Sequence, residues 1–117
     1  MTPATYNFVL FQGATWDRTF TWESPPGTPV NLTGCTARLQ LRVRDSDPDP
    51  PLLELTSQNG GITLGGAAGT VAVVITPAQS SALAFKTANY DLEIVWPSGR
   101  VDRFLQGTIT LDTEVTR

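Results

Sequence analysis

Acidic residues occur in two groups whose spacing could support chemistry. Asp45, Asp47 and Asp49 stand at every second position of one segment, so their carboxylates could offer oxygen ligands to calcium. The segment does not match an EF-hand loop, because Pro50 stands where that loop requires glycine. Two interpretations stay open for residues 45–51, a looser calcium site and a solvated, exposed loop.

The second acidic group is Asp91 and Glu93, which share one face of a predicted strand. Two carboxylates can act together in glycoside hydrolysis, but alternating acids are more often only the solvated face of a strand. The chain has no histidine, which removes the commonest general base, the usual serine triad and most zinc sites. We therefore expect no enzymatic activity, no cofactor, no zinc or thiolate metal site and no small-molecule substrate.

Arginines form a third group, and their chemistry is recognition. Arg38, Arg42 and Arg44 share one phase of a predicted strand, and Lys86 is the only lysine in the chain. Guanidinium groups bind carboxylates and carbonyls in planar pairs, and arginine is enriched at protein interfaces where lysine is depleted. Two interpretations remain: an interface, or cross-strand pairing with Glu54 or Glu93.

Tryptophans are candidates for the same interface. Trp16 and Trp22 share one phase of a predicted strand with Phe20. The pattern favours core packing for both indoles, and a tryptophan at the rim of the core would anchor a partner. We keep Trp16 and Trp22 as candidate interface residues together with the three arginines.

The strand that carries the arginines has the clearest pattern in the chain. Five apolar and five polar residues alternate from Cys35 to Arg44, which predicts a half-buried β-strand. Cys35 is the only cysteine, so no intramolecular disulfide can form, and its apolar phase predicts a buried, inert thiol.

Further short strands are separated by proline- and glycine-rich turns. They are predicted at residues 6–11, 15–22, 52–56, 62–64, 70–76, 88–95 and 101–111. The run Thr76-Pro77-Ala78-Gln79 predicts a capping box and one or two helical turns. Together these features predict an all-β fold: an immunoglobulin-like antiparallel β-sandwich of about seven to nine strands with one short helical turn, formed by residues 1–117 as a single domain.

One tyrosine occupies a position typical of that fold. Tyr90 lies near the start of the penultimate predicted strand, where the tyrosine corner of immunoglobulin-like domains bonds back to nearby backbone. The alternative is an ordinary core tyrosine.

Composition limits the classes of partner. Charged residues make up only 16% of the 117 residues, which indicates that part of the surface is covered by partners. A net charge of −3 gives no general attraction to nucleic acid or anionic lipid. No apolar stretch approaches the length of a membrane span, and residues 1–4 lack the features of a secretion signal, so we expect no membrane insertion and synthesis in a cytoplasm.

Several segments carry a resemblance to a known family. The sequences FQGATW at 11–16, RTFTW at 18–22 and VNLTG at 30–34, leading into ARLQLR at 37–42, resemble small tail-region proteins of tailed bacteriophages. Residues 90–93 and 107–117 look like the same group. More distantly, the chain is similar to the N-terminal domain of phage baseplate upper proteins.

This resemblance implies a β-sandwich that docks onto the virion. We therefore expect a structural virion protein, a tail or baseplate adaptor made in the cytoplasm of the bacterial host, that binds other virion proteins and copies of itself. Two alternatives remain: a capsid cement protein, and a carbohydrate-binding module that stacks host-surface sugars on exposed tryptophans.

Overall fold

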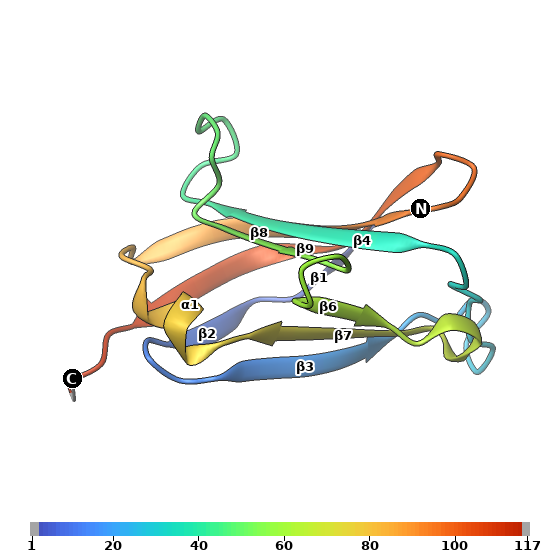
Figure 1. Ribbon diagram of the computed structural model, residues 1–117, viewed down its shortest axis with the longest axis horizontal. Helices are drawn as coiled ribbons and strands as arrows, with labels where there is room; N and C mark the ends of the chain where they lie inside the picture. Colours follow the sequence, from blue (N-terminus) through green and yellow to red (C-terminus); the bar gives the residue numbers. More distant parts are fainter. Residues whose placement is uncertain (1–2, 116–117) are drawn as a thin grey trace.

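The computed structural model describes residues 3–115 of the chain. These residues contain nine strands and two short helical segments, joined by loops (Figure 1). In chain order they are β1 (Ala4–Thr5), β2 (Phe8–Phe11), β3 (Trp16–Thr21), β4 (Thr36–Arg42), β5 (Leu53–Thr56), β6 (Ile62–Leu64), the 3-10 turn η1 (Gly66–Ala68), β7 (Thr70–Ile75), α1 (Pro77–Ser81), β8 (Thr87–Val95) and β9 (Val101–Asp112). The predicted all-β class is confirmed. None of the helices in these residues is long and apolar enough to cross a membrane.

The strands form two facing layers. The larger sheet has the order β1-β9-β8-β4-β5, and β2 also pairs with β9. The smaller sheet has the order β3-β7-β6 (Figure 1). The order β9-β8-β4-β5 opposite β3-β7-β6 is that of an immunoglobulin-like sandwich, as predicted.

The first two strands depart from the antiparallel arrangement that the pattern predicts. Both β1 and β2 run parallel to β9, while the other strand pairs are antiparallel. Between β1 and β2 the Tyr6 amide donates to the Gln106 carbonyl over 2.9 Å. Gly107 permits this approach, because a Cβ atom there would collide with the Tyr6 carbonyl oxygen. The parallel pairing therefore depends on a glycine inside the last strand.

The alternating segment forms β4 but is shorter than predicted at both ends. Ala37, Leu39 and Leu41 are buried as expected. Cys35 precedes the strand and is half-buried rather than buried, and this partial burial raises the pKa of its thiol. Val43 follows the strand and is exposed, because the chain leaves the sheet after Arg42.

The core lies between the two layers and consists mainly of aliphatic side chains. Alternate residues of β7 and β8 face inward, in agreement with the period of two. The largest fully buried side chains include Leu10, Leu32, Leu41, Leu55, Ile62, Ile75, Leu92, Ile94 and Ile109.

The predicted capping box is present at the start of α1. The Gln79 amide donates to the Thr76 hydroxyl oxygen over 3.2 Å, and the Thr76 amide donates to the Gln79 side-chain oxygen over 2.9 Å. The buried hydroxyl of Ser80 accepts from the Gly13 amide and donates to the Ala14 carbonyl. The helix thus holds the turn that joins β2 to β3.

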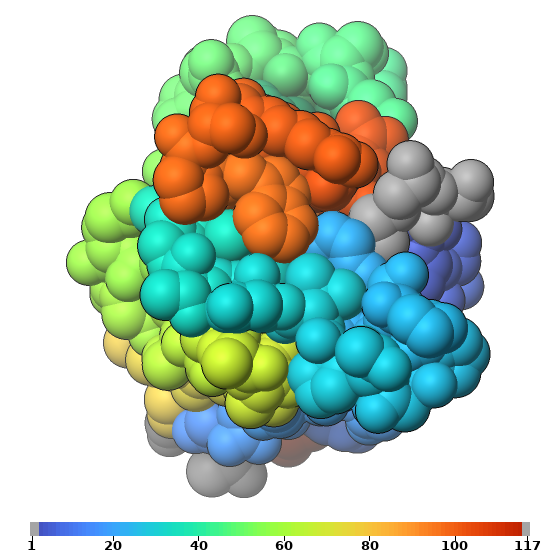
Figure 2. All heavy atoms as spheres, turned by 90° about the vertical axis from the view of Figure 1, so that its right-hand side faces the viewer, coloured from blue at the N-terminus to red at the C-terminus, as the bar shows by residue number. Residues whose placement is uncertain are grey.

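Loops gather at the end of the sandwich opposite α1. Figure 2 views the molecule from that end, where the blue-to-cyan loop after β3 lies below the orange β8–β9 hairpin. This hairpin closes through the Trp96 amide, which donates to the Arg100 carbonyl over 2.8 Å. The proline-rich segment 24–29 lies outside the sheets as predicted, with one isolated bridge from Glu23 to Pro29.

Candidate interaction surface

The outer face of the larger sheet carries the predicted arginines, and two of them lie on β4. Arg38 and Arg42 point outward with Gln40 between them. The Arg38 Nε donates to the Glu93 Oε1 over 2.7 Å, which is one of the two cross-strand pairs weighed above. Glu54 pairs with Gln40 Nε2 over 2.6 Å instead of with an arginine.

Arg42 is the most enclosed of the three arginines, with only 19% of its side chain exposed. Its Nη1 donates to the Asp47 carbonyl over 3.0 Å, and its Nη2 donates to Asp49 and to the Gln40 side-chain oxygen. These bonds fasten the loop after β4 to the sheet. Arg42 is therefore held by contacts within the chain, and its role at an interface stays a prediction.

Arg44 lies apart from the other two arginines. It follows the end of β4, and its backbone amide donates to the Asp47 Oδ2 over 3.0 Å in a turn of the loop. Because the strand ends at Arg42, the three arginines do not extend from one strand face as the alternation predicts. They do not make a single arginine patch.

The acidic loop sends its carboxylates in different directions. Asp45 accepts from the Asn89 side-chain amide over 2.9 Å, Asp47 accepts from the Arg44 amide, and Asp49 pairs with Arg42. Within residues 3–115 no three metal-ligating side chains cluster. This divergence favours the exposed-loop interpretation of residues 45–51 over the calcium site.

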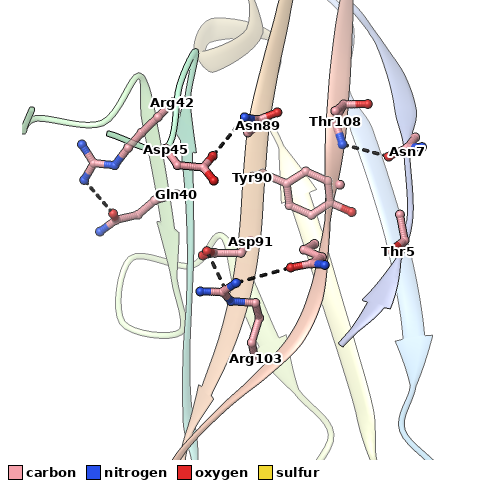
Figure 3. A pocket seen from close by; sticks show the side chains of 12 residues that line it. Thr5, Asn7, Gln40, Arg42, Asp45, Asn89, Tyr90, Asp91, Arg103 and Thr108 are labelled. Atoms are coloured by element: carbon pink, nitrogen blue, oxygen red, sulfur yellow. Dashed lines mark hydrogen bonds and ion pairs between the residues drawn. The ribbon is translucent and has the colours of Figure 1, made fainter. Parts of the chain in front are cut away.

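A shallow polar hollow lies beside this loop on the same face (Figure 3). Side chains from β4, β8 and β9 and from the chain near β1 line it, among them Gln40, Asn89, Asp91, Arg103 and Thr108. Asp91 and Arg103 point toward each other there, with 3.6 Å between Oδ2 and Nε. Burial raises the pKa of Asp91, and the Arg103 charge partly opposes this shift.

The carboxylates of Asp91 and Glu93 are thus held by two different arginines. Glu93 faces Arg38, and Asp91 faces Arg103. Each carboxylate has a cationic partner, and no serine, cysteine or histidine lines the hollow. The arrangement can form hydrogen bonds and ion pairs with another polar surface.

The two candidate tryptophans are half-buried against the core. Trp16 stacks on Phe8, with 4.0 Å between ring centroids and 12° between ring planes. Trp22 contacts Trp96 and Phe104, with centroid distances of 5.9 and 5.3 Å. The stack on Phe8 occupies one face of the Trp16 ring, and the contacts of both residues match the core alternative.

Tyr90 makes a hydrogen bond to backbone, but the acceptor is distant in sequence. Its hydroxyl donates to the Tyr6 carbonyl oxygen over 2.5 Å. The predicted tyrosine corner would bond nearby backbone, whereas Tyr6 lies 84 positions earlier, between β1 and β2. Burial raises the pKa of the Tyr90 phenol well above its ordinary value.

Two open features were not predicted from the pattern. Val9 and Phe11 of β2 are 46% and 57% exposed, side by side on the outer face of the larger sheet. The edge of β3 is the second, because β3 pairs with β7 alone. Alternation could have indicated which β2 side chains share a face, but it carries no information on which strand lies at an edge.

No protein-family model matches this chain, and comparison with curated proteins finds no similar sequence.

Proposed function

We propose that this chain is a structural subunit of a tailed-bacteriophage virion, at the tail or baseplate, and that it acts by binding neighbouring subunits. The resemblance of segments 11–16, 18–22, 30–34 and 37–42 to phage tail-region proteins supports the virion setting. The immunoglobulin-like sandwich is compatible with that setting and by itself is common to many functions.

One observation carries the assembly role. The acidic side chains Asp91 and Glu93 of the outer face each form an ion pair with an arginine. The apolar side chains of Val9 and Phe11, in contrast, are exposed next to each other. Adjacent exposed apolar side chains are typical of surfaces that bind another protein. The partners that fit this surface are other virion proteins and copies of the chain.

The test is to locate the chain in purified particles of the phage that encodes it. Quantitative mass spectrometry should find a few to a few dozen copies per particle, and cross-linking should join the chain to tail or baseplate subunits. Hundreds of copies cross-linked to the shell would identify a capsid cement protein instead. Absence from the particle would contradict the virion role altogether.

A matched pair of variants tests the surface itself. Val9→Ser with Phe11→Ser should lower incorporation into particles, because both side chains lie in the exposed patch on β2. Val101→Ser is the control, since Val101 is similarly exposed at 44% but lies at the start of β9 beside the β8–β9 hairpin. Equal incorporation of both variants would show that the β2 patch is not the contact.

A further inference from the structure

The edges of the two sheets differ in how well they are covered. β3 and β6 border the smaller sheet, and β5 and the β1–β2 segment border the larger one. β3 is the longest of these edge strands, with six residues from Trp16 to Thr21, and runs along the lower border of the molecule in Figure 1. It contains no proline and no lysine, and its pairing with β7 has no bulge. Of the usual devices that keep an edge strand from pairing, it therefore lacks proline, lysine, a bulge and a covering segment, and it carries only the charges of Asp17 and Arg18.

The register shows which β3 backbone groups face outward. On β7, the Val74 amide and the Thr70 carbonyl bond to the β6 side, so alternate residues of β7 bond to β3. Trp22 continues the β3 pattern, because its amide donates to the Gly69 carbonyl. The amides and carbonyls of Asp17, Thr19 and Thr21 must then point away from β7. Within residues 3–115, no hydrogen bond from another segment reaches them.

The other edges offer fewer open groups. On β5, the Asn59 side chain accepts from the Thr56 amide over 2.9 Å and donates to the Glu54 carbonyl over 3.1 Å. β6 has only three residues, and on β2 the Phe11 carbonyl accepts from the Ala14 amide. β3 is thus the edge that is best suited to accept another strand.

We propose that β3 pairs antiparallel with β3 of a second copy of this chain, about a two-fold axis at Thr19. In this register Thr19 stands opposite Thr19, and Asp17 stands opposite Thr21. On the inward side Arg18 stands opposite Phe20. No like charges stand directly opposite each other, although Arg18 of the two copies are diagonal neighbours across the axis, and Thr–Thr pairs are favourable across antiparallel strands. This self-complementarity is the reason to assign the edge to a second copy rather than to an unrelated strand.

The resulting dimer joins two three-stranded sheets into one continuous sheet. Asp17, Thr19 and Thr21 of both copies supply about six backbone hydrogen bonds, two for each hydrogen-bonded pair. The contact is narrow, so we expect a weak dimer in solution that becomes effective when other contacts hold the copies together. The inference deepens the proposed assembly role by naming one contact between copies.

The experiment uses charge at the two-fold axis. Sedimentation equilibrium from micromolar to millimolar concentration should show a reversible dimer of the parent chain. Thr19→Lys and Thr19→Glu should each weaken the dimer several-fold, because like charges then stand directly opposite each other. An equimolar mixture of the two variants should restore a one-to-one dimer. Thr19→Val, which keeps the amide donor, should dimerise like the parent.

Three results would overturn the pairing: a parent chain that stays monomeric, a dimer insensitive to both charged variants, or a mixture that stays monomeric. Thr19 is exposed, so circular dichroism and thermal unfolding of each variant should match the parent and separate loss of pairing from loss of fold. Normal presence of the chain in particles together with a monomeric parent would refute the β3 pairing and leave the assembly role intact. Absence of the chain from particles would refute the assembly role. Sedimentation would still test the β3 pairing, because it does not depend on particles.

Discussion

The Tyr90 hydroxyl donates a 2.5 Å hydrogen bond to the carbonyl oxygen of Tyr6, and so joins the penultimate strand to the chain between β1 and β2. Tyr90 is 5% exposed, and its ring also meets Phe8 edge to face at a centroid distance of 5.5 Å. The bond therefore lies in the aromatic region that closes the β2–β3 side of the sandwich. The sequence predicts that Tyr90 bonds to backbone nearby in the chain, and the hydroxyl reaches distant backbone instead.

Tyr90→Phe should destabilise the fold. The substitution removes the donor and leaves the Tyr6 carbonyl without this partner, which is expected to lower the free energy of unfolding by about 1–2 kcal/mol. Urea unfolding followed by tryptophan fluorescence measures the change. Tyr6→Phe is the control, because it retains the carbonyl acceptor, and we expect a smaller effect. A Tyr90→Phe variant as stable as the parent would contradict a structural role for the bond.

Arg42→Ala should loosen the loop at residues 45–51. Arg42 is largely enclosed and bonds to Asp47 and Asp49, so its removal should increase amide hydrogen exchange in the loop and destabilise the fold by about 1 kcal/mol. Arg38→Ala is the matched control on the same strand face. Its ion pair with Glu93 is half exposed and should contribute at most about 0.5 kcal/mol. Unchanged exchange in the Arg42→Ala loop would contradict the anchoring role.

Asp91→Asn should alter how stability depends on pH. Burial is the largest cause of the raised Asp91 pKa, so the folded state binds the proton more tightly than the unfolded state does. The ionised carboxylate then lowers stability as pH rises from the ordinary aspartate pKa of about 3.9 through the raised folded value. Asparagine does not ionise, so the free energy of unfolding of Asp91→Asn should rise relative to that of the parent as pH increases through this window. Below the window the parent carboxyl is protonated, and this relative gain should disappear.

Urea unfolding of both proteins at a series of pH values measures this dependence. A constant difference between Asp91→Asn and the parent at every pH would contradict the raised pKa. The Arg103 charge interacts with the ionised carboxylate only, so loss of this pair acts in the same window and reduces the gain without reversing its sign. Contacts that do not depend on ionisation add a constant offset, so the slope is the relevant readout.

Gly107→Ala should disrupt the parallel pairing of the first strands with β9. The new Cβ would meet the Tyr6 carbonyl, a backbone atom that cannot move without shifting the chain between β1 and β2. We expect a loss of about 2 kcal/mol or more in unfolding free energy, with faster amide exchange in residues 4–11. Gln106→Ala on the same strand is the control and should stay within about 0.5 kcal/mol of the parent. Equal stability of the two variants would contradict the close approach.

Local patterns were sufficient to predict much of the fold. The alternation around Leu39 and Leu41 predicts their burial, because strand side chains point to opposite faces whatever the neighbouring strand is. The Thr76 capping box is also predicted correctly, since its two hydrogen bonds join residues three positions apart.

The candidate surface was less predictable, because the hydrogen bonds and ion pairs of its side chains join residues that are distant in sequence. The arginine phase on β4 is visible in the chain, but only the tertiary structure assigns Arg38 to Glu93 and Arg42 to the loop, and places Arg44 beyond the strand. The pattern also left Asp91 as one of two equivalent acids, whereas the fold partly buries it opposite Arg103.

The amino-acid sequence by itself determined the strands, their inward faces, the helical turn and the lack of histidine chemistry, because these depend on residue type and short-range spacing. Only the tertiary structure decided that β1 and β2 run parallel to β9, that Tyr90 reaches Tyr6, and that β3 has an open edge. Strand order and register follow from long-range packing, and a period of two is the same for a strand in the middle of a sheet as for one at its border.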